Sequence, residues 1–119
     1  MSLDLKTTET TIASSGFTQA GQTAKLVEFR SLRTGRMLYV YKAQGFPIHA
    51  DVVIDPAFNH TPLLTIPDVA PNKRVEFRHG SNMTTFPKKS NRGKKPEHYG
   101  RALHVSSTAA LQRLCLAYA

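Results

Sequence analysis

The chain has 119 residues, 40% of them hydrophobic and 20% charged, so it can form one domain with a modest core but not two. It carries 16 lysines and arginines against 8 acidic residues, a net charge of +8, which favours an anionic partner: nucleic acid first, an acidic protein second. A single cysteine, Cys115, excludes an internal disulfide and a cysteine-based zinc site. No segment has the length of a membrane span or the pattern of a secretion signal, so we expect a cytoplasmic protein without a membrane partner.

The first predicted element is a weak N-terminal helix. Asp4 is a suitable N-cap, the helix would run through Ser15, and Gly16 would end it. Threonines are frequent in this segment and are poor helix formers, so only packing against the rest of the chain would hold the helix. Phe17 is expected to pack where the chain leaves it.

A β-hairpin follows. Residues 25–30 alternate between apolar and charged side chains, which predicts a strand with Val27 and Phe29 facing inward. Residues 33–36 form a turn, and the aromatic and β-branched residues 37–41 return as the partner strand. Because both faces of the return strand are apolar, we expect it to be central in its sheet or covered on both sides.

The middle of the chain predicts shorter elements. Residues 51–54 form a third strand, and residues 56–71, which hold four of the 7 prolines, form a crossover with at most one edge strand. Residues 73–79 predict a further strand with Val75 and Phe77 inward.

The C-terminal part predicts a last strand at 101–105 and then a helix capped by Ser106 or Ser107. Its apolar positions have helical spacing. They are Leu111, Leu114, Cys115 and Tyr118. Together the elements predict an α+β fold: about six mostly antiparallel strands, with the C-terminal helix and the weak N-terminal helix packed on one side.

The sequence also contains a candidate internal repeat. The letters VEFR of residues 27–30 recur unchanged at residues 75–78, and a Pro-x-His follows in both halves. This predicts two copies of a β-hairpin-plus-strand unit, residues 25–54 and 73–105, joined by the proline-rich crossover within a single domain of residues 1–119. The alternative is two strands whose alternating patterns converged.

The segment 88–101 is the most basic part of the chain, with six cations against one acid, Glu97. The cations are Lys88, Lys89, Arg92, Lys94, Lys95 and Arg101. Turn-forming residues interrupt them, which predicts a loop rather than a helix. Such a loop is typical of a phosphate-binding surface. We therefore expect nucleic-acid contacts from these cations and from Arg78, His98 and Tyr99, where Tyr99 is either a half-buried anchor or a stacking platform for a base.

Two other functions fit the same residues. The basic loop could dock on an acidic protein, as in an inhibitor or adaptor. A small nuclease or hydrolase could use His98 or the pair His49 and Asp51, which share one face of a strand. Isolated His and Asp are more often surface or hydrogen-bonding residues, and no phosphate-loop or dinucleotide-binding glycine pattern occurs. We therefore predict no metal and no cofactor, and favour a binding protein over an enzyme.

Overall fold

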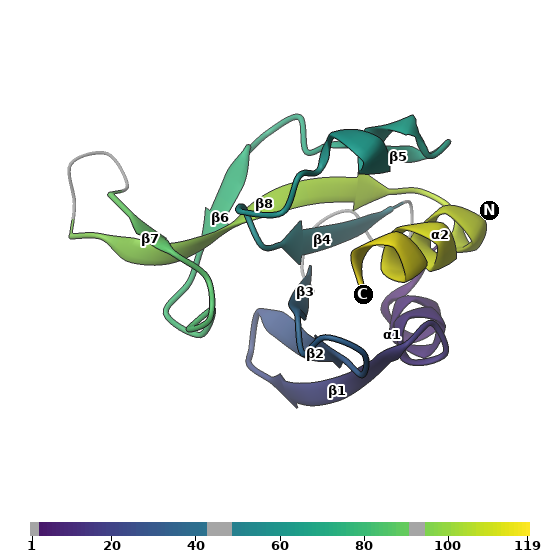
Figure 1. The fold of residues 1–119 in the computed structure, drawn as a ribbon, viewed down its shortest axis with the longest axis horizontal. Helices are drawn as coiled ribbons and strands as arrows, with labels where there is room; N and C mark the ends of the chain where they lie inside the picture. The colour runs from purple at the N-terminus through teal and green to yellow at the C-terminus, as the bar shows by residue number, and fades with distance from the viewer. Residues whose placement is uncertain (1–2, 43–48, 91–94) are drawn as a thin grey trace.

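The computed structural model describes residues 3–42, 49–90 and 95–119 (Figure 1). These residues confirm the predicted α+β class, with two helices and an antiparallel sheet. The elements are α1 (Leu5–Ala13), β1 (Phe17–Gln22), β2 (Leu26–Ser31), β3 (Met37–Tyr41), β4 (Ala50–Ile54), a 3-10 helix η1 (Thr61–Thr65), β5 (Val69–Pro71), β6 (Phe77–His79), β7 (Lys88–Lys89), β8 (Glu97–Val105) and α2 (Thr108–Tyr118).

Helix α1 begins as predicted and ends earlier, at Ala13. The Asp4 carboxylate accepts a hydrogen bond from the Thr7 amide at 2.7 Å and so caps the first turn. Gly16, with φ of +93°, then takes the left-handed conformation that turns the chain away from the helix. The next segment forms strand β1, which the sequence did not predict. Its sequence, FTQAGQ, does not alternate between apolar and polar residues. Backbone pairing with β2 holds the strand at the edge of the sheet.

The hairpin of β2 and β3 and the following strand β4 are confirmed as an antiparallel meander. Val27 and Phe29 are buried in the main core, which lies between the sheet and the two helices. Strand β3 lies between β2 and β4 and is buried on both faces: Leu38 joins the main core, and Tyr39 joins a second, smaller cluster on the opposite face. The sequence pattern therefore placed this strand correctly.

Strand β8 pairs with four other strands and so joins the parts of the sheet (Figure 1). Strands β4 and β7 pair along one edge of it, and β5 and β6 pair along the other. The predicted strand of 101–105 was too short, because β8 already begins at Glu97. Its first residues are polar, and backbone pairing with β6 and β7 brings them into the sheet.

Residues 80–87 connect β6 to β7 and cross the face of the sheet opposite the helices; we call them the strap. Met83 and Phe86 of the strap pack on the second cluster, where the Tyr39 and Phe86 rings meet edge to face at 5.2 Å. Gly100 lies directly beneath the strap. A Cβ atom there would lie 2.4 Å from Val53 Cγ1 and 3.0 Å from a Phe86 ring carbon, so the close approach requires glycine.

The prediction of a long inward-facing strand at 73–79 was wrong. The Asn72 side chain accepts hydrogen bonds from the Arg74 and Val75 amides at 2.8 and 3.2 Å, and this turn delays the strand until Phe77. Val75 and Phe77 are only half-buried. Strands β6 and β7 both pair with β8, whereas β2, β3 and β4 pair in consecutive order, so the two units differ in strand pairing. The internal repeat stays a prediction from the sequence.

The C-terminal helix is confirmed. The Ser107 hydroxyl accepts a hydrogen bond from the Ala110 amide at 3.1 Å, and all four predicted apolar side chains are buried. The Tyr118 hydroxyl donates to the Met37 carbonyl at 2.6 Å and accepts from the Asp55 amide at 2.8 Å, which ties the helix to the ends of β3 and β4. Neither helix of the described residues is both long and apolar enough to cross a membrane.

Candidate nucleic-acid interface and adjoining pocket

The two ends of the basic segment lie in paired strands, where the sequence predicted an irregular loop, whereas Ser90, Lys95 and Pro96 between them have no regular secondary structure. Lys88 lies opposite His98 and Lys89 opposite Glu97, in the antiparallel pairing of β7 with β8. Arg92 and Lys94 lie outside the described residues. Asn91, Gly93 and Pro96 suggested that the whole segment is a loop. The pairing of β7 with β8 instead makes the residues at its two ends part of β-strands.

Three lysines of this hairpin, Lys88, Lys89 and Lys95, are exposed. The ion pairs within the described residues join Arg78 to Asp51 and Arg101 to Glu76, and neither uses one of these lysines. Glu97 lies opposite Lys89 in the register, yet the Lys89 ammonium lies over aromatic rings instead. The hairpin therefore presents positive charge that no ion pair neutralises in the described part of the chain.

An aromatic and basic surface is formed by side chains of β6, β7 and β8 and includes one of these lysines. We call it the platform: Phe77, His79, Lys89, Tyr99 and Arg101. The Phe77 and Tyr99 rings meet edge to face at 5.1 Å, and the His79 ring is stacked on Tyr99 at 6.0 Å. The Lys89 ammonium lies 4.4 Å from the Phe77 ring centre and 5.5 Å from that of Tyr99, and the Arg101 guanidinium lies 4.8 Å from Phe77. All five side chains belong to one face, as their strand register requires.

Of the other predicted contacts, the structure separates His98 from the platform and places Tyr99 and Arg101 in it. His98 points to the opposite face, where its Nδ1 shares a hydrogen bond with the Phe86 carbonyl at 2.7 Å and holds the strap. Tyr99 is half-buried and packs edge to face on Phe77 in the platform. Arg101 Nη1 forms an ion pair with Glu76 Oε2 at 3.5 Å, and the Glu76 side chain is 70% exposed.

Arg78 lies on the strap side of the sheet. Its Nε donates to Asp51 Oδ2 at 3.0 Å, its Nη2 donates to the same oxygen, and its guanidinium lies 3.9 Å from the centre of the Tyr41 ring. Asp51 is fully buried, and Asn72 Nδ2 also donates to its Oδ2 at 3.0 Å. The charge of Arg78 is thus paired with a carboxylate that would be costly to bury alone. Sequence reasoning missed this pair because its two members are 27 residues apart.

The proposed metal pair of His49 and Asp51 is not assembled as a ligand set. Asp51 is occupied by Arg78 and Asn72, while the His49 ring lies 3.9 Å from that of His104, the residue that pairs with Asp51 across the sheet. Burial, and next the neighbouring His49, lower the pKa of His104, although Asp51 opposes this. Within the described residues, no group of three or more His, Cys, Asp and Glu side chains is placed to hold a metal ion.

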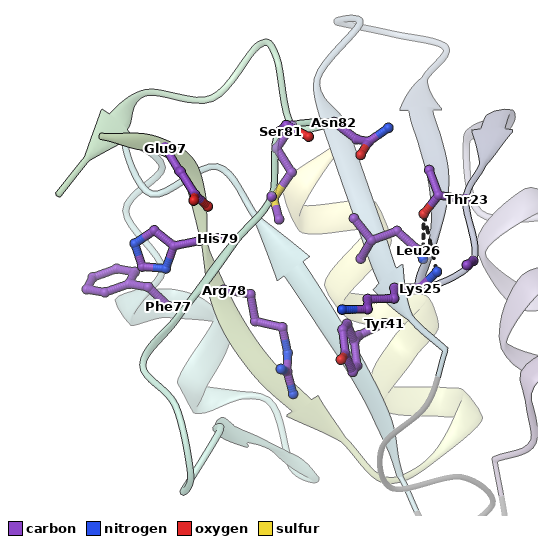
Figure 2. Close-up of a pocket in the computed structure, with 13 residues that line it drawn as sticks. Thr23, Lys25, Leu26, Tyr41, Phe77, Arg78, His79, Ser81, Asn82 and Glu97 are labelled. Atoms are coloured by element: carbon purple, nitrogen blue, oxygen red, sulfur yellow. Dashed lines mark hydrogen bonds between the residues drawn. The ribbon is translucent and has the colours of Figure 1, made fainter. Parts of the chain in front are cut away.

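A pocket of about 550 Å³ lies between the β1–β2 turn and the strap (Figure 2). One wall comes from the turn and the ends of β2 and β3, and the other comes from β6 and the strap. The lining residues with polar side chains are Thr23, Lys25, Tyr41, Arg78, His79, Ser81, Asn82 and Glu97. Sequence reasoning did not find this pocket, because its walls are brought together by the fold rather than by any continuous segment.

No protein-family model matches this chain, and no curated protein matches it. Functional inference for this protein therefore starts from its own residues and their geometry.

Proposed function

We propose that this protein binds nucleic acid through its phosphates, with Lys88, Lys89 and Lys95 as the principal contacts. The observation that carries the proposal is the exposed hairpin lysines, which have no ion-pair partner among the described residues. The hairpin of β7 and β8 extends beyond the body of the fold, away from the helices (Figure 1). Cations in such a position can follow a phosphate backbone without steric conflict with the rest of the protein.

The platform supports nucleic acid over an acidic protein as the partner. Bases stack on aromatic side chains with little dependence on sequence, and Tyr99, Phe77 and His79 offer ring surface directly beside Lys89. An acidic protein would use the lysines but has no comparable need for the rings. The binding mode is then backbone contact with sequence-tolerant stacking, which gives affinity and salt dependence with little sequence preference.

The remaining predicted residues take different parts in this proposal. Arg101 adds charge at the edge of the platform, partly offset by Glu76. Arg92 and Lys94 belong to the same segment of the sequence and add to its charge. Arg78 and His98 have structural partners, Asp51 and the Phe86 carbonyl, so they are not proposed as phosphate contacts on this surface.

The test is fluorescence anisotropy with labelled single-stranded and duplex oligonucleotides over a series of salt concentrations. We expect log K to fall steeply with log salt, by about 0.7 to 0.9 per phosphate contact. Replacing Lys88, Lys89 and Lys95 together with glutamine should reduce the slope by about 2 to 3 and weaken binding on every sequence alike.

The matched control replaces three exposed cations elsewhere, Lys6, Arg30 and Arg113, and lowers the net charge by the same amount. This variant should keep most of the slope. Equal losses in the two variants would mean that only net charge matters, and an unchanged slope in the hairpin variant would contradict the proposal. A partner retained on the immobilised protein after nuclease treatment would favour the acidic-protein alternative.

A further inference from the structure

The pocket beside the strap contains a guanidinium whose position is fixed. Arg78 Nε and Nη2 both donate to Oδ2 of the buried Asp51, and the guanidinium lies 3.9 Å from the centre of the Tyr41 ring. A guanidinium is planar and carries five N–H groups, so the edge formed by Nη1 and Nη2 keeps two parallel donors. The Arg78 side chain is 18% exposed, so a ligand can reach it. That free edge suits two oxygens of one oxoanion.

A second cation, Lys25, lines the same pocket from the β1–β2 turn. Figure 2 shows its side chain pointing towards the side of the pocket that Tyr41 and Arg78 form. Lys25 is exposed and belongs to neither ion pair of the described residues. Because Asp51 offsets the charge of Arg78, Lys25 supplies the positive charge that remains to attract an anion.

Neutral hydrogen-bond donors complete the lining. The Thr23 hydroxyl oxygen accepts hydrogen bonds from the amides of Lys25 and Leu26 at 3.3 and 3.1 Å, which leaves its own hydrogen to donate to a ligand. Ser81 and Asn82 line the pocket from the strap, and both are exposed. Hydroxyl and amide donors satisfy the remaining oxygens of an anion without a further charge.

No acidic side chain faces the fixed guanidinium from within the pocket, as far as the described residues show. Glu97 is the one acid among the described lining residues, and its side chain lies on the platform face together with that of Lys89. Phe77 and His79 flank Arg78 along β6, so their side chains also lie on the platform face. The ligand contacts therefore come from the strap side of the sheet alone, and the pocket is separate from the platform.

Two cationic contacts and several neutral donors match a compact anion with more than one charge. We propose that the pocket binds a phosphate monoester, with its oxygens between the free edge of Arg78 and the Lys25 ammonium. A phosphate monoester carries a charge of about −1.5 to −2 at pH 7. The volume of about 550 Å³ lies within the range of small-molecule sites, ~300–1,000 Å³, so it also accommodates the esterified group beside Leu26 and Met83. The monoester is the end of a nucleic-acid strand or a small phosphorylated molecule, and the same contacts recognise both.

The test is an NMR titration at low salt with methyl phosphate, a monoester, and with dimethyl phosphate, a diester. We expect methyl phosphate to bind about tenfold more tightly, because its additional charge strengthens both cationic contacts. Its largest amide shifts should fall on Lys25, Arg78 and Ser81. Equal affinities for the two compounds, or shifts confined to the lysines of β7, would overturn the pocket.

Variants of Lys25 test the contact without disturbing the buried pair of Arg78 and Asp51. Lys25→Gln should weaken methyl phosphate binding about five- to tenfold, because it removes one charge-assisted contact, and Lys25→Arg should keep most of the affinity. Lys42→Gln is the matched control. The Lys42 amide donates to the Lys25 carbonyl at 2.8 Å, but the Lys42 ammonium donates to Gln22, and Lys42 is not among the described lining residues. Equal weakening by Lys25→Gln and Lys42→Gln would mean that only local charge matters and would overturn the site.

Two oligonucleotides of one sequence, with and without a 5′-phosphate, identify the source of the monoester. Tighter binding of the phosphorylated strand that is lost in Lys25→Gln would assign the pocket to strand ends. Equal binding of the two strands, with methyl phosphate binding that still depends on Lys25, would assign it to a small phosphorylated molecule. Neither a 5′-phosphate effect nor methyl phosphate binding would overturn the pocket. Replacing Lys88, Lys89 and Lys95 with glutamine should leave methyl phosphate binding unchanged, so the pocket and the hairpin surface fail independently.

Discussion

Arg78 on β6 and Asp51 on β4 are joined by an ion pair that passes across the intervening strand β8. The carboxylate is fully buried, and its Oδ2 accepts three hydrogen bonds, two from Arg78 and one from Asn72. The Arg78 side chain lies on the strap side of the sheet, opposite the platform. The pair fixes β6, and β6 in turn carries two of the five platform residues, Phe77 and His79.

Removing Arg78 should destabilise the protein severely. Arg78→Met leaves the buried Asp51 charge without its partner, and we expect a loss of about 3–5 kcal/mol in the free energy of unfolding. Arg101→Met is the matched control: its partner Glu76 is 70% exposed, so the loss of that pair should be below about 1 kcal/mol. Urea unfolding of both variants measures the difference. Similar small losses would show that the Asp51 pair is not needed for stability.

Gly100 should not tolerate a methyl group. In Gly100→Ala the new Cβ would overlap Val53 and press on the Ile54 carbonyl and the Phe86 ring, which should cost about 1–3 kcal/mol of stability. Gly21→Ala is the control, since its Cβ would meet only the Glu28 carboxylate at 3.6 Å or beyond, in ordinary contact. Thermal unfolding should show a lower Tm for the first variant and little change for the second. Equal Tm values would contradict the tight passage of the strap over β8.

Stability should fall in mildly acidic solution because of His104. Burial lowers its pKa in the folded protein, so below the ordinary value of 6.5 the unfolded chain takes up a proton that the folded protein resists. The contribution is complete above pH 6.5 and is lost as pH falls towards the folded pKa. The neighbours facing this ring are His49, Asp51, Arg78 and Lys73. Urea unfolding between pH 7 and 5 should show a smaller decline for His104→Gln; an equal decline would rule His104 out as its source.

The thiol of Cys115 should be inert in the folded protein. The side chain is fully buried, and burial raises its pKa to about 12, so almost no thiolate forms at neutral pH. A chromogenic disulfide reagent should give no signal with the native protein and one equivalent in urea. Rapid labelling without denaturant would mean that helix α2 opens readily from the core.

The parts of the fold that local patterns define were predictable. Val27 and Phe29 alternate with charged residues, and the apolar side of α2 follows helical spacing, so both elements bury the expected faces. Strand β1 and the first half of β8 were not predictable, because their residues are polar and the pairing partner alone makes them strands. Tertiary context overrides propensity in both cases.

For the candidate site, too, features that are close together in the sequence were predictable, and features that depend on tertiary contacts were not. The clustering of Lys88, Lys89 and Lys95 is visible in the sequence, because these residues lie close together along the chain. The distinction between Arg78, which is paired, and the lysines, which are not, depends on Asp51, a residue in an otherwise apolar strand. The pocket likewise is lined by residues that are far apart along the chain, such as Lys25 and Arg78, and no local pattern indicates that they share it.

The most direct test of nucleic-acid binding is amide chemical-shift mapping by NMR with a single-stranded oligonucleotide at low salt. The account predicts that the largest shifts fall on Lys88, Lys89, Lys95 and Glu97 and on the neighbouring platform residues Phe77 and Tyr99, and that they fade as salt is added. Shifts confined to the helices, or no shifts at low salt despite a net charge of +8, would contradict it.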